Sequence, residues 1–97
     1  ELFDIEDLLF CGRGEAIRLL EDGDTSIGGR IPVNTSGGLT SRGHPVGATG
    51  ARLLLDAGRQ VTGTAGDYQV AGARTYGTLN IGGSLGTVVS LVVGLRD

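Results

Sequence analysis

The sequence contains no lysine, no methionine and no tryptophan, and only one cysteine and one histidine. Eight arginines face eleven acidic residues, which gives a formal net charge of −3. Such a chain has no general basic field to attract nucleic acid or an anionic membrane surface. One thiol, Cys11, excludes an internal disulfide, and the apolar runs are far shorter than the roughly 20 residues of a membrane span. The acidic, leucine-rich start is not typical of a cleavable signal peptide, so we expect an intracellular protein.

Glycine and aliphatic residues dominate what is present. Leu, Ile, Val and Phe make up 28 of the 97 residues, enough for a hydrophobic core. The 19 glycines show no collagen-like period, so they indicate irregular backbone rather than a fibre. Residues 1–97 are therefore predicted to form one small α/β domain. A chain so short and so rich in glycine is expected to depend on further polypeptide for its stability.

The pattern of breakers and apolar positions predicts the elements in order. We expect the end of a helix near residue 9, a short helix over 13–21, an extended piece over 30–33, and the longest helix from Pro45 to about residue 60. An exposed polar connector over 63–72 precedes strands over 74–81 and 87–93. The long helix opens with small residues on every side, which predicts a buried helix. The last strand is apolar on both faces, so its cover is expected to come from more chain.

His44 is the first candidate for catalysis. It stands directly before Pro45 at the start of the long helix, where the helix dipole disfavours an imidazolium and favours a developing negative charge. A neutral ring can accept a proton, so His44 is a candidate general base. The alternative is a structural histidine that only donates and accepts hydrogen bonds.

The glycine corner, residues 80–84, is the second candidate. Its alternative interpretation is an ordinary hairpin turn. In the functional interpretation, the backbone amides of Gly82 and Gly83 point at a reacting oxygen as part of an oxyanion hole. The corner is no phosphate loop, because it lacks the Lys-Ser/Thr ending of one.

Other polar residues give weaker signals. Cys11 follows an apolar stretch and has no neighbouring base, so a core thiol is favoured over a nucleophile. The acidic turn around Asp22 and Asp24 has no calcium-loop spacing, and no metal site is predicted. Tyr68 and Tyr76 are possible acids, but a connector residue and a strand residue are the simpler interpretations.

Residues 34–52, Asn-Thr-Ser-Gly-Gly-Leu-Thr-Ser-Arg-Gly-His-Pro-Val-Gly-Ala-Thr-Gly-Ala-Arg, resemble the histidine block of thiolases. The Gln69–Arg74 stretch and the glycine corner are similar to the closing section of the same superfamily, above all to its sterol-carrier-type branch. The resemblance covers the whole chain, but only about the last quarter of a family member. It implies one part of the C-terminal half of a five-layer αβαβα fold, with a buried helix and an antiparallel strand pair in a larger mixed sheet.

The resemblance also implies a function in lipid metabolism: acyl transfer on coenzyme A thioesters, by Claisen condensation or thiolytic cleavage of a 3-ketoacyl-CoA. His44 matches the histidine that activates a nucleophilic cysteine of the N-terminal half, and Gly82 matches an oxyanion-hole amide. Asn80, Gly83 and Gly43 would belong to the active-site loops. Coenzyme A and its acyl thioesters would be substrates, with no permanently bound cofactor, in the cytoplasm or, in a eukaryote, the peroxisome.

Asn80 departs from the commonest family pattern, since most thiolases carry an acid/base cysteine at that position. Sterol-carrier-type members carry theirs in an upstream block that lies outside this sequence, as does the nucleophile. The 97 residues alone are therefore expected to be inactive. Expected partners are the remainder of a thiolase polypeptide or a second chain, a homo-oligomer of the parent, and possibly a small accessory protein. Two alternatives stay open: a thiolase-like aldolase, for example for steroid side chains, and a non-catalytic scaffold subunit.

Overall fold

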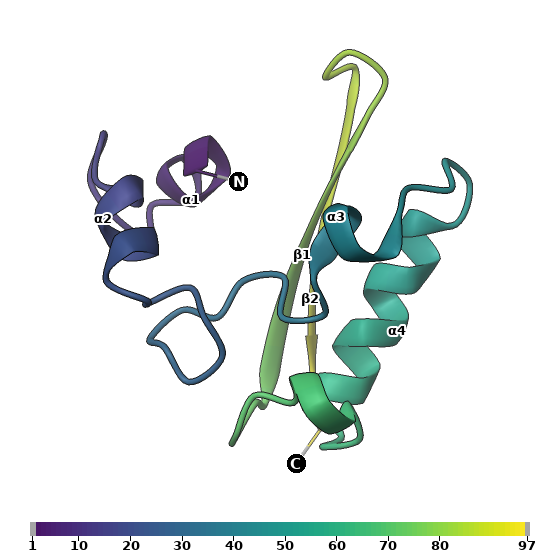
Figure 1. Cartoon of the computed structure of the whole chain (residues 1–97). Helices are drawn as coiled ribbons and strands as arrows, with labels where there is room; N and C mark the ends of the chain where they lie inside the picture. Colours follow the sequence, from purple (N-terminus) through teal and green to yellow (C-terminus); the bar gives the residue numbers. More distant parts are fainter. Residues whose placement is uncertain (1, 97) are drawn as a thin grey trace. The chain divides into compact units, whose positions relative to one another are not determined.

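A computed structural model describes residues 2–96, with only the backbone of Leu2. The elements follow the order α1 (Leu2–Asp7), α2 (Ala16–Glu21), α3 (Gly38–Arg42), α4 (Thr49–Val61), the 3₁₀ turn η1 (Gly66–Tyr68), β1 (Thr75–Gly82) and β2 (Thr87–Gly94) (Figure 1). The chain divides into two compact units, residues 1–33 and 34–97. The mixed α/β class predicted from the sequence is confirmed. The prediction of a single domain over 1–97 stays a prediction.

The second unit is built on an antiparallel hairpin against one helix. β1 and β2 pair over their full length, from Thr75 opposite Gly94 to Gly82 opposite Thr87, and α4 packs against both strands, mostly against β1 (Figure 1). The predicted strand pair is confirmed to within a residue at each end. The β-branched residues that dominate 87–93 explain this accuracy, because they favour an extended backbone.

α4 is amphipathic in this chain rather than buried on all sides. Its buried residues lie along one side, at spacings of four and seven positions: Thr49, Asp56, Ala57, Gln60 and Val61. The small residues before and within its first turn are exposed, including Gly47 and Ala48. Burial of these positions stays a prediction about a larger assembly.

The helix begins at Thr49, later than the expected start at Pro45. Residues 45–48 form a turn in which the Pro45 carbonyl accepts hydrogen bonds from the amides of Ala48 (2.8 Å) and Thr49 (3.1 Å). The turn thus leads directly into α4. The helix ends at Val61, two residues before Gly63, whose positive φ of 73° is typical of the residue that terminates a helix.

The segment 63–72 is less exposed than predicted. It contains η1 and the buried Ala65, and Gln69 reaches back to donate a hydrogen bond to the Gln60 carbonyl at 2.9 Å. The connector is therefore anchored to the end of α4. The short helix α3 was not predicted, because it lies inside a glycine-rich stretch.

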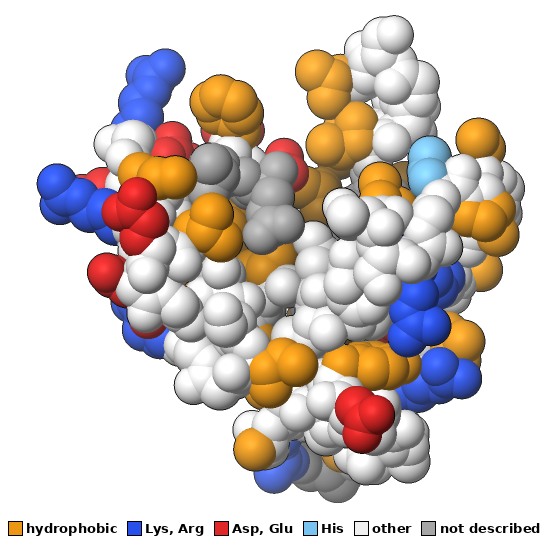
Figure 2. Space-filling model, viewed as in Figure 1, with side chains coloured by type: hydrophobic (Ala, Val, Ile, Leu, Met, Phe, Trp, Pro, Cys, Tyr) orange, Lys and Arg blue, Asp and Glu red, His pale blue; other side chains and the backbone are white. Residues whose placement is uncertain are grey.

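Large apolar side chains remain exposed on the hairpin. Val88 and Val92, which point to the same face of β2, are 55% and 77% exposed. On the alternate face, Val89, Leu91 and Val93 share their side with Thr78, which is buried. Apolar side chains are common on the surface drawn in Figure 2. β2 is thus apolar on both faces, as its sequence predicts.

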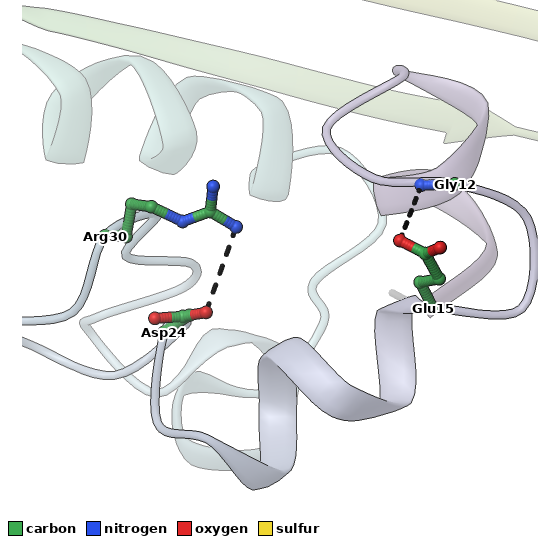
Figure 3. Close-up of polar contacts among 4 residues, drawn as sticks. All are labelled: Gly12, Glu15, Asp24 and Arg30. Atoms are coloured by element: carbon green, nitrogen blue, oxygen red, sulfur yellow. Dashed lines mark hydrogen bonds and ion pairs between the residues drawn. The ribbon is translucent and has the colours of Figure 1, made fainter.

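The first unit has a small core of Ile5, Ala16 and Leu19, with Cys11, Ile31 and Val33 packed against it. α2 starts three residues later than predicted because Gly14 has a positive φ of 79°, which a helix does not allow. The Glu15 carboxylate accepts a hydrogen bond from the Gly12 amide at 3.2 Å, and Arg30 lies 3.9 Å from Asp24 (Figure 3).

Residues 30–33 form no regular strand, although the amides of Ile31 and Val33 donate hydrogen bonds to the carbonyls of Asp24 and Thr25. The intervening Pro32 has no N–H to continue a ladder.

Candidate functional site

The second unit contains an open groove of about 330 Å³ where the start of α4 meets the hairpin turn. One wall comes from the segment that leads into α4 and from its first turn. The other comes from the end of β1, the turn and β2. The residues lining it are His44, Val46, Thr49, Gly50, Asn80, Ile81, Gly82, Gly83, Thr87 and Val89. Two segments distant in sequence therefore form one site.

Gly50 lies beside Asn80 in the groove. A Cβ added at this position would lie 3.4 Å from Nδ2 of Asn80, which is ordinary van der Waals contact. The Asn80 amide therefore lies against the first turn of α4.

The His44 ring is exposed but held at one nitrogen. Its Nδ1 lies 2.7 Å from Oγ1 of Thr49, and that hydroxyl lies 3.3 Å from the Pro45 carbonyl oxygen. No hydrogen bond joins Nε2 to any residue in the described range 2–96. The second ring nitrogen is therefore open to a ligand or to solvent.

The glycine corner has two different glycines. Gly82 is the last residue of β1, and a Cβ there would meet only Thr87 at ordinary contact distances of 3.7 and 3.8 Å. Gly83 begins the turn with a positive φ of 59°, a conformation that favours glycine. The backbone requirement for glycine therefore falls on Gly83.

Gly43 does not line the groove. Its φ is 75°, and its carbonyl accepts a hydrogen bond from Nη1 of Arg52 at 3.3 Å. Arg52 therefore fastens the residue before His44 to the second turn of α4.

Apart from His44, no titratable side chain lines the groove. Tyr68 lies elsewhere, where its hydroxyl is 3.4 Å from Oδ1 of the buried Asp56. Tyr76 is half-buried in β1, and desolvation followed by the charge of Asp56 raises its pKa. In the first unit, burial followed by the carboxylates of Glu6 and Glu15 raises the pKa of Cys11, which disfavours its thiolate. These three groups are thus poorly suited to act as catalysts in this groove.

The described part of the chain holds no group of three His, Cys, Asp or Glu residues that could bind a metal ion. It also contains no helix of the length and apolarity that a membrane span requires. The polar groups that line the groove are the His44 ring, the hydroxyls of Thr49 and Thr87, the Asn80 side-chain amide and backbone groups.

Sequence reasoning brought His44 and the glycine corner forward but missed Thr49. A threonine in the first turn of a helix has no distinctive pattern by itself. The available signal was its position on the buried side of α4, five residues after the only histidine.

The chain is similar in sequence to a known family and to several known proteins. Residues 1–95 match the family described as thiolase C-terminal domain-like. An acetyl-CoA acetyltransferase of Methanothermobacter thermautotrophicus is 53% identical over 83 residues, which cover 86% of this chain and 22% of that protein. Human sterol carrier protein 2 is 41% identical over 91 residues, 94% of this chain and 17% of that protein. A benzoylsuccinyl-CoA thiolase subunit of Thauera aromatica is 39% identical over 70 residues, 72% of this chain and 18% of that protein. The chain spans about a fifth of the length of these relatives.

Proposed function

Since this chain belongs to the thiolase family as a C-terminal domain-like member, we propose that it supplies part of an active site for acyl transfer on coenzyme A thioesters. In this proposal His44 accepts and returns a proton, and the amide of Gly82, with Gly83 beside it, binds the thioester oxygen. The observation that carries it is that His44 and the glycine corner line the same groove. The names of relatives, acetyl-CoA acetyltransferase and benzoylsuccinyl-CoA thiolase subunit, agree with this chemistry.

The lining of the groove suits a thioester carbonyl. It offers one imidazole, one hydroxyl-bearing helix turn and one side-chain amide among apolar groups, and no carboxylate or guanidinium. The N-terminus of α4 adds a partial positive charge, which stabilises a developing oxyanion by typically 0.3 to 1 kcal/mol. A phosphate group would find no cationic side chain here, so the reacting acyl end is the better fit.

His44 carries one proton between two thiols in the proposed reaction. The lone pair of a neutral His44 takes the proton of a thiol supplied by another segment or chain, which leaves a thiolate and an imidazolium. The thiolate attacks the thioester carbonyl, and the leaving coenzyme A thiolate takes the proton from His44. The partner segment is the rest of a thiolase polypeptide or a second chain, in a homo-oligomeric parent. A cytoplasmic or peroxisomal location stays part of the proposal.

The decisive experiment replaces His44 by Ala in the protein assembled with the segment that supplies the thiol. We expect turnover per folded site to fall about 10² to 10⁴-fold, roughly 2.7 to 5.4 kcal/mol, with a much smaller change in acyl-CoA binding. Acyl-CoA with coenzyme A is the first substrate pair. Leu54→Ala is the matched control, because Leu54 is exposed on α4 and does not line the groove.

A second candidate function stays open at Asn80. An amide in place of a corner cysteine leaves the groove without a thiol of its own, which fits a sterol-carrier-type thiolase with its cysteine in another segment and also an aldolase that cleaves a carbon–carbon bond of a coenzyme A thioester. A β-hydroxyacyl-CoA tests this alternative. Loss of turnover with this probe alone in His44→Ala supports the aldolase, whereas unchanged turnover with both probes refutes a catalytic His44 and leaves the scaffold subunit.

A further inference from the structure

Thr49 is the residue that contacts the ring of His44 from the start of α4. It is the first residue of α4 and only 7% exposed, whereas His44 is exposed. Its Oγ1 lies between two groups, Nδ1 of His44 at 2.7 Å and the Pro45 carbonyl oxygen at 3.3 Å. The hydroxyl thus links the ring to the backbone of the turn that carries it.

The direction of these hydrogen bonds follows from the number of protons. A neutral imidazole has one N–H, and a threonine hydroxyl has one proton. Oγ1 of Thr49 is placed to donate to the Pro45 carbonyl oxygen, and in that arrangement it accepts from Nδ1–H. The Pro45 carbonyl also accepts from the amides of Ala48 and Thr49, so the tautomer of the ring distinguishes this arrangement from the one in which the hydroxyl donates to Nδ1.

We propose that Thr49 is a positioning residue that holds the neutral His44 ring in its Nδ1–H tautomer and leaves Nε2 as the proton acceptor. This inference rests on the proposed function. The bond partner of one ring nitrogen sets the protonation of the other. When Nε2 takes a proton from the attacking thiol, the Nδ1–H bond to Thr49 is retained in the imidazolium. No ring movement is then needed between accepting the proton and returning it.

Nuclear magnetic resonance tests the tautomer directly. The sequence contains one histidine, so a chain labelled with ¹⁵N-histidine gives ring signals from His44 alone. The spectrum is recorded on the full chain within the assembly used for turnover, at a pH where the ring signals are those of the neutral imidazole. We expect a protonated Nδ1 and an unprotonated Nε2. A protonated Nε2 in the unmodified chain overturns the proposal.

Variants separate positioning from folding. Thr49→Val keeps the branched shape and removes the hydroxyl, so we expect the Nε2–H tautomer to appear. Thr49→Ser keeps the hydroxyl and is expected to keep Nδ1–H. Thr62→Val is the matched control, since the exposed Thr62 hydroxyl bonds to the Gly58 carbonyl at 2.7 Å at the far end of α4. An unchanged tautomer in folded Thr49→Val refutes the assignment.

Turnover gives the second readout. Thr49→Val should lower kcat about 10- to 100-fold with little change in KM, the size of effect seen for partners that orient metal-bound histidines, and Thr49→Ser should restore it. If His44→Ala leaves turnover unchanged, the proposed function fails whatever the tautomer. If His44→Ala abolishes turnover while Thr49→Val keeps the wild-type tautomer and rate, only the role of Thr49 fails. If Thr49→Val unfolds, two results still test the role of Thr49. These are the tautomer of His44 in the unmodified chain and the turnover of Thr49→Ser.

Discussion

At the scale of single residues, Gln60 is the largest side chain that is fully buried in the described part of the chain. It is 1% exposed. Its Nε2 donates hydrogen bonds to Oγ1 of Thr35 (3.1 Å) and to the Tyr68 carbonyl (2.6 Å), and its Oε1 accepts one from the Val70 amide (2.9 Å). One side chain therefore joins the loop before α3, the helix α4 and the segment after η1.

Replacing Gln60 by Leu should destabilise the second unit by about 2 to 5 kcal/mol. The substitution keeps an apolar core of similar volume but leaves backbone groups of Tyr68 and Val70 without their partner, at about 1 to 3 kcal/mol for each buried group. The measurement is the midpoint of denaturant unfolding. Leu54→Gln, an exposed change on the same helix, should stay within about 0.5 kcal/mol of the parent. Equal stability of the two variants would show that the Gln60 bonds contribute little.

Candidate site residues could be selected from the sequence where the residue type and its neighbours are themselves unusual. His44 beside Pro45 and the glycines of the corner could be selected, and the resemblance to thiolases joined them. Gln60 and Thr49 could not be selected. A glutamine in a helix is normally exposed, and the partners of Gln60 lie 25 positions before it and 8 to 10 positions after it. The role of Gln60 depends on how the chain returns to α4, which no local pattern contains, and a threonine five residues after a histidine has no distinctive signal of its own.

At the scale of elements, the β-branched and apolar residues of the hairpin were sufficient to predict both strands. The predicted starts of two helices were too early, because the backbone there is not yet helical. Gly14 adopts a positive φ before α2, and residues 45–48 form a turn before α4. Propensity cannot distinguish such a turn from a first helical turn. The hairpin turn itself shows the same effect, because Leu85 adopts a φ of 65° without being glycine.

Replacing Leu85 by Gly should therefore stabilise the hairpin. A left-handed conformation costs a residue with a Cβ about 1 to 2 kcal/mol, which glycine avoids. Glycine also makes the unfolded chain more flexible, and this lowers the gain by about 0.5 to 1 kcal/mol. We expect a net gain of up to about 1 kcal/mol in the free energy of unfolding. Leu85→Ala is the control, since it shortens the side chain but keeps the Cβ. An equal gain in Leu85→Ala would assign the effect to the removal of an exposed leucine (72% exposed) instead.

At the scale of the whole molecule, buried apolar area is scarce. Many large apolar side chains are exposed, and half of the buried hydrophobic residues are alanines. Within the described range the buried ones are Ile5, Ala16, Leu19, Ala57, Val61 and Ala65. Many exposed large apolar side chains are expected where a surface contacts other polypeptide. That the chain depends on further polypeptide stays a prediction.

The isolated chain should associate with itself as its concentration rises. The face of β2 with Val88 and Val92 is the test surface, because both side chains are more than half exposed. Val88→Thr with Val92→Thr keeps β-propensity while making that face more polar, so the average mass in sedimentation equilibrium should fall towards that of the monomer. Gly47→Ala is the matched control, since a Cβ there meets nothing within 4 Å. A parent chain that stays monomeric and unfolds cooperatively would contradict the prediction.

The His44–Thr49 contact also has a consequence for the order in which the groove forms. It joins residues five positions apart and needs only the turn at Pro45 and the start of α4, whereas the opposite wall needs the hairpin to close and then to meet the helix. Contacts between neighbours in sequence form sooner than contacts that enclose a long loop. During folding, the imidazole is therefore oriented before any backbone amide of the glycine corner arrives opposite it. On the proposed function, a nascent or partly unfolded chain holds the His44 ring without the glycine corner opposite it, and the groove is complete only after the last docking step.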